Sequence, residues 1–125
     1  MEIKIGDYHE QSITVRHEDT AAVYGSGKLE VFATPALVGL MENTAIKCLE
    51  GKLDEGCDTV GIEINVQHVK ATAVGKQVRC RATVTELDGR RIGFRCEAWD
   101  ATATIGTAVH NRFVINVEKF MNKLN

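Results

Sequence analysis

Residues 34–51 have the sequence TPALVGLMENTAIKCLEG, and the packing expected of the whole chain follows from this segment. Thr34 can cap a helix, and Pro35 suits its first position, where no amide hydrogen is needed. Gly51 occupies the place at which a left-handed residue closes a helix. At about 100° per residue, the polar side chains share one narrow stripe, made by Asn43, Lys47 and Glu50. The segment therefore predicts a helix from Pro35 to about Glu50 that is apolar around most of its girth and hence buried.

From residue 57 onward, apolar residues recur at every second position, which is the period of strands. Four strands are predicted, and their inward-facing residues are Val60, Ile62, Ile64 and Val66; Val78, Cys80, Ala82 and Val84; Ile92, Phe94, Cys96 and Ala98; and Ile105, Val109, Phe113, Ile115 and Val117. Asp88 and Gly89 predict a two-residue hairpin turn, because a tight turn requires a positive φ. A weaker alternation around Ile13 predicts a leading strand, and residues 18–24 and 118–124 predict short helical segments.

A meander of strands that are apolar on one face needs a cover, which the buried helix can supply. The predicted fold class is α+β, with an antiparallel β-sheet wrapped around one long central α-helix. A chain of 125 residues corresponds to one domain, so we expect a single domain over residues 1–125. Hydrophobic residues at 44% and charged residues at 26% are typical of a globular protein with a real core.

Charge and apolar patterning exclude several classes of protein. Fifteen basic and 17 acidic residues give a net charge of −2, without the basic surplus that nucleic-acid and anionic-membrane binders use. No apolar run approaches the roughly 20 residues of a membrane span, and the N-terminus lacks a hydrophobic signal core. The four cysteines lack zinc-ligand spacing, as do His9, His17 and His110. We therefore expect free thiols, no metal, no nucleic-acid or membrane partner, and a cytoplasmic location.

Three polar residues stand where a purely structural chain would carry apolar ones. Glu42 lies in the middle of the apolar helix face, where an ionised carboxylate is costly unless it is paired. The alternative is a rotated helix that exposes Glu42 and buries part of the polar stripe. His68 continues the inward phase of the first long strand, which suits either a hydrogen-bonded core histidine or, with Glu42, an acid/base pair. Thr34 suits either a plain cap or a hydroxyl at the positive end of the helix dipole.

The same residues carry a resemblance to a known family. The segments VFATPALVGLME (residues 31–42), TVGIEINVQH (59–68) and HNRFVI (110–115) make the chain similar to the fluoroacetyl-CoA thioesterase-like branch of the hotdog-fold thioesterases. This resemblance spans most of the chain and implies the hotdog fold. It also implies a catalytic threonine, glutamate and histidine at Thr34, Glu42 and His68. By the same resemblance, Gly61 packs against the acyl thioester and Arg112 contacts the substrate.

The function that the resemblance implies is hydrolysis of a small acyl-CoA thioester to free acid and CoA, with no cofactor beyond the CoA of the substrate. Whether Glu42 acts as nucleophile or as general base toward water is left open. Residues 25–28 (GSGK) stand where the fluoroacetyl-specific member of the family carries bulky aromatics over the acyl pocket, so fluoroacetyl selectivity and the identity of the acyl group are also left open. Two other functions use the same scaffold: a non-catalytic acyl-CoA or small-ligand binding domain, and a dehydratase or hydratase.

Spacing along the helix predicts a homodimer. Thr34 and Glu42 are eight residues apart, or about 12 Å along a helix axis, so they cannot touch within one helix. They can share a site if a second copy supplies one of them, or if the chain folds back at Thr34. We expect a two-fold dimer, alone or within a tetramer, with helices side by side and sites between subunits. On the strand pattern alone, Arg112 lies opposite Phe113 in phase and is expected to face outward.

Overall fold

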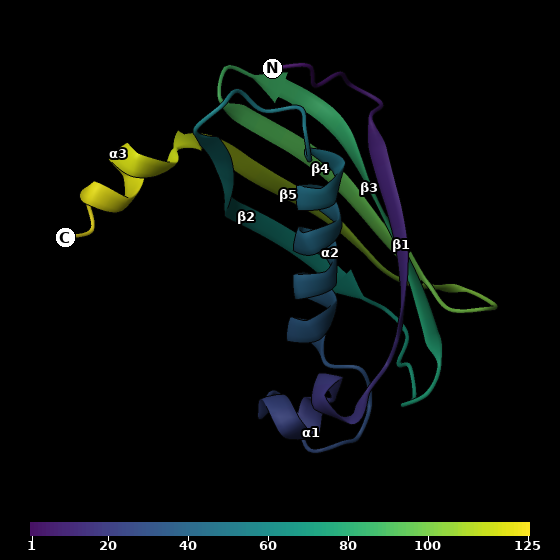
Figure 1. Cartoon of the computed structure of the whole chain (residues 1–125). Helices are drawn as coiled ribbons and strands as arrows, with labels where there is room; N and C mark the ends of the chain where they lie inside the picture. Colours follow the sequence, from purple (N-terminus) through teal and green to yellow (C-terminus); the bar gives the residue numbers. More distant parts are fainter.

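The computed structural model describes residues 1–125 and shows one five-stranded antiparallel sheet curved around a single long helix, α2 (Figure 1). The strands are β1 (Tyr8–Thr14), β2 (Cys57–His68), β3 (Gln77–Asp88), β4 (Arg91–Trp99) and β5 (Thr104–Asn116). The helices are α1 (Ala21–Tyr24), α2 (Thr34–Cys48) and α3 (Val117–Asn122), with one 3-10 turn, η1, at His17–Asp19. The predicted α+β architecture is confirmed, and no helix is long and apolar enough to cross a membrane.

The strand order in the sheet is β1-β3-β4-β5-β2, so the predicted meander is right for only three of its four strands. Strands β3, β4 and β5 follow one another, whereas β2 pairs with β5 at the far edge instead of with β3. A tight turn makes consecutive strands pair, but residues 69–76 form a long link between β2 and β3 that imposes no such pairing. The tight turn between β3 and β4 lies at Gly89 and Arg90, one residue later than predicted, and Gly89 has a φ of 59°.

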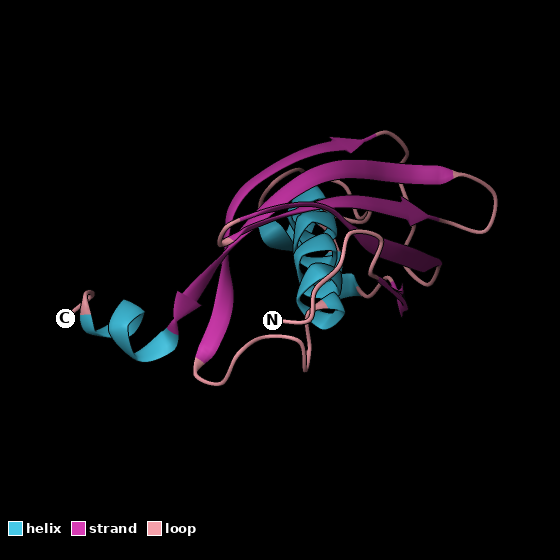
Figure 2. Cartoon of the chain, turned by 90° about the horizontal axis from the view of Figure 1, so that it is seen from above, coloured by secondary structure: helices cyan, strands magenta, loops and turns pink.

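Helix α2 lies on the concave face of the sheet and supplies the cover that the strands need (Figure 2). Its buried side chains are Leu37, Leu40, Met41, Thr44, Ala45 and Cys48. Gly51 has the predicted left-handed conformation, with a φ of 74°. The predicted start of the helix was wrong by one residue, because α2 begins at Thr34 and the N-cap residue is Ala33. The Thr34 hydroxyl therefore does not cap the helix and is available to another partner.

The inward residues predicted for β3 and β4 are confirmed, because all eight are buried in the hydrophobic core. Cys80 and Cys96 belong to this set, and Cys48 on α2 joins them. The four cysteines are free thiols, as predicted. The core therefore lies between α2 and the centre of the sheet, and the β2–β5 side is left for the polar residues described below.

The inward phase predicted for β5 was wrong beyond its first residue. Ile105 is buried as predicted, but Val109 and Phe113 are 57% and 37% exposed. The intervening His110 and Arg112 are buried instead, at 1% and 4% exposure. The cause is an irregularity in the pairing with β4, where Ala98 and Trp99 pair with residues 106 and 104, so that Ile105 is an extra residue. One extra residue inverts the facing of every side chain that follows. Two further members of the predicted set also miss the core, the half-buried Ile115 and the exposed Val117.

The inward phase predicted for β2 was wrong in its first half. A bulge between Gly61 and Glu63 shifts the register against β5, so Ile62 is 53% exposed. Val60, also predicted to face inward, pairs with the exposed Phe113. After the bulge, the predicted phase holds, and Ile64 and Val66 pack against the core. The bulge therefore gives Gly61 and the later inward residues a common face, which matters for the site.

Candidate active site

The Thr34 hydroxyl and the His68 imidazole meet at one end of the sheet. Thr34 is the first residue of α2 and His68 is the last residue of β2, and Thr34 Oγ1 lies 2.8 Å from His68 Nδ1. The ring of Phe32 stands edge-on to the imidazole, with the ring centroids 6.4 Å apart. Two of the three predicted catalytic residues are therefore in direct contact.

His68 is a neutral imidazole with one nitrogen free. Burial lowers the pKa of His68 below its usual value. Because Nδ1 is engaged with Thr34, the nitrogen left for another group is Nε2, which is buried and has no hydrogen-bond partner in the chain. Buried polar atoms without a partner are rare in folded proteins. In the tautomer whose Nδ1 carries the ring proton and donates to Thr34 Oγ1, Nε2 can accept a proton from a group placed against it.

Glu42 lies in a second cluster, with Gly61 and Arg112. Glu42 Oε2 is 3.7 Å from Arg112 Nη1, and the Glu42 side chain is 39% exposed. The carboxylate therefore faces the sheet, as predicted from its place on the apolar helix face. A Cβ atom at Gly61 would lie 2.8 Å from Glu42 Oε2, so the absence of a side chain there leaves the space that the carboxylate occupies.

Arg112 is a buried guanidinium held on several sides. Its Nε donates to Thr59 Oγ1 at 2.9 Å and its Nη2 donates to the Thr59 carbonyl oxygen at 3.1 Å. Its Nη1 lies 3.2 Å from His110 Nε2. Burial lowers the pKa of Arg112, while the charge of Glu42 acts in the opposite direction. The outward position expected for Arg112 from the strand pattern was wrong, because the extra residue in β5 turns its side chain inward.

Sequence reasoning missed two residues of this cluster, Thr59 and His110. Thr59 was assigned no role, and it lies in the first half of β2, where the bulge inverts the predicted phase. His110 was considered only as a metal ligand and set aside. The signal that could have found it is the two-residue spacing between His110 and Arg112, because such residues share one face of a strand. No group of three or more His, Cys, Asp or Glu side chains in the chain is arranged to hold a metal ion.

Within one chain, the two clusters stay apart. Thr34 contacts His68, and Glu42 contacts Arg112, but no hydrogen bond or ion pair joins Glu42 to Thr34 or His68. The separation follows from the helix, since Thr34 and Glu42 are the first and ninth residues of α2, about 12 Å apart along its axis. A cavity of about 280 Å³ lies beside the Thr34–His68 pair and is bordered by Phe32 and Lys70.

Comparison with known proteins identifies the family. The model of the fluoroacetyl-CoA-specific thioesterase family (FlK) matches residues 15–118. The chain belongs to this family. The fluoroacetyl-CoA thioesterase of Streptantibioticus cattleyicolor is 37% identical over 111 residues, which cover 89% of this chain and 80% of that relative.

Solved structures of family members share the fold of this chain. The fluoroacetyl-CoA thioesterase FlK is 32% identical, with a TM-score of 0.91 over 98% of this chain and 95% of that one. Variants of FlK have been solved with fluoroacetate and CoA and with acetyl-CoA. A hot-dog-like protein from Thermanaerovibrio acidaminovorans, at 24% identity, has a TM-score of 0.91 over 98% of this chain and 90% of that one. The predicted hotdog fold and the membership of a thioester-hydrolase family are confirmed.

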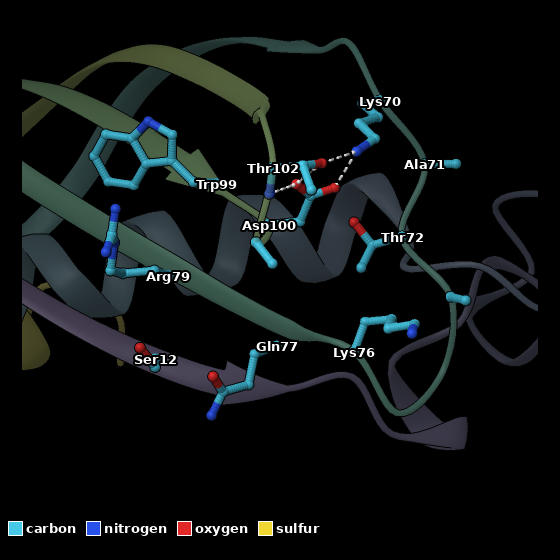
Figure 3. Close-up of a pocket in the computed structure, with 12 residues that line it drawn as sticks. Ser12, Lys70, Ala71, Thr72, Lys76, Gln77, Arg79, Trp99, Asp100 and Thr102 are labelled. Carbon is cyan, nitrogen blue, oxygen red and sulfur yellow. Dashed lines mark hydrogen bonds and ion pairs between the residues drawn. The ribbon is translucent and has the colours of Figure 1, made fainter.

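A larger cavity of this FlK-family chain shares Lys70 with the cavity beside Thr34 and His68 but lies outside both clusters. It is a groove of about 520 Å³ on the outer face of the sheet, between the 70–76 link and residues 99–102 (Figure 3). Three of its four charged groups already have partners, because Lys70 bonds Asp100 and Thr102, and the Arg79 guanidinium lies 5.1 Å from the centre of the Trp99 ring. None of the residues of the two clusters lines the groove. The chemistry of the chain is therefore to be sought at the clusters.

Proposed function

We propose that this chain hydrolyses a small acyl-CoA thioester to the free acid and CoA, at a site that two copies of the chain complete. The observation that carries the proposal is the His68 imidazole, which Thr34 orients through Nδ1 while the buried Nε2 has no partner. An oriented imidazole with one free nitrogen is a proton acceptor for water or for a thioester reaction, once a reacting group lies against it. Membership of the FlK family supports thioester hydrolysis as that reaction.

Glu42 is the residue proposed to act on the thioester carbonyl carbon. If Glu42 is the nucleophile, one of its oxygens bonds to this carbon, the C–S bond breaks, and CoA takes up a proton and leaves as the thiol. Water then hydrolyses the acyl-enzyme anhydride. As a general base, Glu42 takes a proton from water, and the water oxygen bonds to the carbon instead. Mass spectrometry of enzyme quenched during a single turnover separates the two, because only the nucleophilic route adds the mass of the acyl group to Glu42.

The remaining site residues act around that step. His68 moves the proton between the attacking group and the leaving thiol, and Thr34 holds the imidazole through its hydroxyl. Gly61 leaves room for the thioester beside the Glu42 carboxylate, since even a methyl group there would approach Oε2 to 2.8 Å. Arg112 supplies the positive charge that stabilises the ionised carboxylate and faces the polar part of the substrate.

A second copy of the chain is proposed because one copy cannot bring Glu42 to His68. Strand β2 pairs only with β5, so its other edge has unpaired backbone groups along 12 residues. The exposed Ile62, Val109 and Phe113 lie on the outer face beside this edge. Exposed edges and apolar residues of this kind are usually covered by another chain. Pairing through β2 gives a homodimer in which each site takes Thr34 and His68 from one copy and Glu42 from the other.

Mixing two inactive variants tests the shared site directly. Glu42→Gln and His68→Ala are each expected to lose most of kcat while keeping the fold. In a mixed dimer, one of the two sites then carries both changes and the other carries neither. Equal mixing after subunit exchange is expected to restore about a quarter of wild-type activity. No recovery in a sample shown to contain mixed dimers would contradict a shared site, and near wild-type turnover by Glu42→Gln alone would remove Glu42 from the mechanism.

The acyl group is to be found with a panel of acyl-CoA thioesters, with CoA release followed by a thiol reagent. Ser26, in the 25–28 segment, borders the cavity beside Thr34 and His68, and this segment has no aromatic residue to close over an acyl chain. We therefore expect turnover of several short acyl groups instead of selection for fluoroacetyl-CoA alone. Binding without thiol release across the panel would favour a ligand-binding domain, and loss of an enoyl double bond without thiol release would favour a hydratase.

A further inference from the structure

We infer that His110 is a positioning residue that fixes the Arg112 guanidinium beside Glu42 and limits how closely it approaches the carboxylate, an inference that rests on the proposed role of Glu42 in hydrolysis. His110 lies in β5, two residues before Arg112, and both side chains face the concave side of the sheet. Only 1% of His110 is exposed, so substrate does not reach it directly. Its effect on the reaction must pass through a neighbouring group.

The surroundings of His110 fix the position of its ring. In the sheet, His110 lies between Ile64 of β2 and Phe94 of β4. The Phe94 ring stacks on the imidazole at an interplanar angle of 30°, with the centroids 6.2 Å apart. The ring cannot swing away without displacing a buried aromatic side chain.

The hydrogen bonds of His110 determine which nitrogen carries the proton. Nδ1 lies 2.7 Å from the backbone carbonyl oxygen of Glu63, and a carbonyl oxygen can only accept, so Nδ1 carries the hydrogen. Nε2 lies 3.2 Å from Arg112 Nη1, and a guanidinium nitrogen can only donate, so Nε2 is the bare acceptor. The neutral Nδ1–H tautomer satisfies both contacts, and neither of the other two protonation forms of the ring does.

His110 thereby makes the only hydrogen bond to Arg112 Nη1. Thr59 accepts from Nε and Nη2 of the same guanidinium, and Nη1 is left for His110 and for Glu42, whose Oε2 lies 3.7 Å away. Without His110, Nη1 is free to turn fully toward the carboxylate. A closer ion pair would draw the Glu42 oxygen away from its position over Gly61 and lower its reactivity.

Acid should break this arrangement in a defined way. Protonation puts a hydrogen on Nε2, which then faces the N–H of Arg112 instead of accepting from it. The charged groups that face the His110 ring are Arg112 of β5 and Glu42 of α2. The other neighbours are uncharged: the Glu63 backbone carbonyl of β2 and the Phe94 ring of β4. Burial is the main cause that lowers the pKa of His110, and Arg112 lowers it further, while the Glu63 carbonyl and Glu42 act in the opposite direction. Neutral His110 is therefore the form present at pH 7, and acid is needed to protonate it.

Nitrogen NMR of the full-length protein tests the positioning directly, without any need for activity. We expect a His110 ring with the proton on Nδ1. We also expect a slowly exchanging proton on Arg112 Nη1, which should be lost in His110→Met and kept in His110→Gln. Glutamine retains an oxygen near the place of Nε2 that can accept from Arg112 and does not titrate. A proton on Nε2 of His110, or an unchanged Arg112 Nη1 proton signal in folded His110→Met, would overturn the inference. Either result would do so whether or not the protein hydrolyses acyl-CoA.

Kinetics then tests the consequence for hydrolysis. We expect His110→Met to lower kcat about 10- to 100-fold with KM within about threefold, because the substrate still binds while the Glu42 carboxylate is misplaced. His110→Gln should keep kcat within about fivefold and should lose part of the acid-side fall of the pH profile. His17→Gln, at an exposed histidine far from Arg112, is the matched control and should change neither. Wild-type kcat in folded His110→Met would refute the inference while leaving the hydrolase function in place, whereas a wild-type protein without turnover would refute the function itself.

Discussion

Adding one methyl group at Gly61 is expected to slow hydrolysis while leaving the fold intact. In Gly61→Ala, the new Cβ would lie 2.8 Å from Glu42 Oε2, 3.2 Å from Arg112 Nη1 and 3.3 Å from His110 Cε1. Ordinary van der Waals contact begins near 3.4 Å, so the Glu42 oxygen must retreat by about 0.6 Å and the other two atoms by far less. The methyl group therefore acts mainly on the position of the carboxylate.

The size of the effect follows from this displacement. The Glu42 oxygen is the far end of a flexible side chain that is 39% exposed, so it can move without disturbing the core. We expect the unfolding midpoint to stay within about 4 °C of the wild type. Catalysis is more sensitive, because misplacing a reacting group by about 1 Å can cost about 100-fold in rate. We expect kcat to fall about 10- to 100-fold, which corresponds to about 1.4–2.7 kcal/mol of activation free energy.

The assay is thiol release from the best acyl-CoA of the panel, measured for Gly61→Ala, Glu42→Gln and the double variant. If the methyl group acts by moving the carboxylate, it should cost less than about threefold once Glu42 is already glutamine. Wild-type kcat in folded Gly61→Ala would refute the reasoning. A full additional loss in the Glu42→Gln background would show that Gly61 acts on the substrate independently of Glu42.

Two further predictions concern the rest of the molecule. In the native protein at pH 8, a thiol reagent should modify the half-buried Cys57 first and the three buried cysteines only after denaturant is added. Labelling of all four cysteines at one rate would contradict this prediction. Burial raises the pKa of two of these thiols, to about 11 for Cys80 and about 12 for Cys96. The Asp100 carboxylate pairs with Lys70 and accepts hydrogen bonds from two backbone N–H groups, and these contacts lower the pKa of Asp100 below the ordinary 3.8. The contribution of Asp100 to the free energy of unfolding is therefore present above pH 3.8 and is lost as the pH falls through the folded-state pKa. Asp100→Asn should therefore melt below the wild type at pH 7 with a gap that narrows under acid, and a gap that stays constant down to pH 2 would exclude this origin.

Local pattern was enough to predict the central helix and the strands that form the middle of the sheet. The polar stripe of α2 and the alternation in β3 and β4 arise within a few neighbouring residues, and short-range periodicity records which side of an element is buried. The same logic singled out Glu42 and His68, because each interrupts an apolar face. The Thr34–His68 contact was not visible locally, since Thr34 is also a good helix cap and 34 residues separate the pair.

Pattern failed where one extra residue enters a strand. Ile62 in β2 and Ile105 in β5 are such residues, and the side chains before and after each of them follow opposite phases. A single inserted residue leaves the apolar composition of the strand unchanged, so the sequence still suggests an uninterrupted alternation. This is why Arg112 was expected to face solvent and why His110 went unnoticed as its partner.

The amino-acid sequence by itself therefore determined the elements of this protein and the residue types able to do chemistry, because these depend on local spacing and on the cost of a polar group on an apolar face. The tertiary structure decided which of these residues meet. The bulge in the pairing of β2 with β5 and the bulge in the pairing of β4 with β5 bring Gly61, His110 and Arg112 to Glu42, which stays apart from His68. Contacts of this kind join segments about 20 to 70 residues apart, and they are selected by the burial and hydrogen bonding of the whole fold, which no local window of sequence contains.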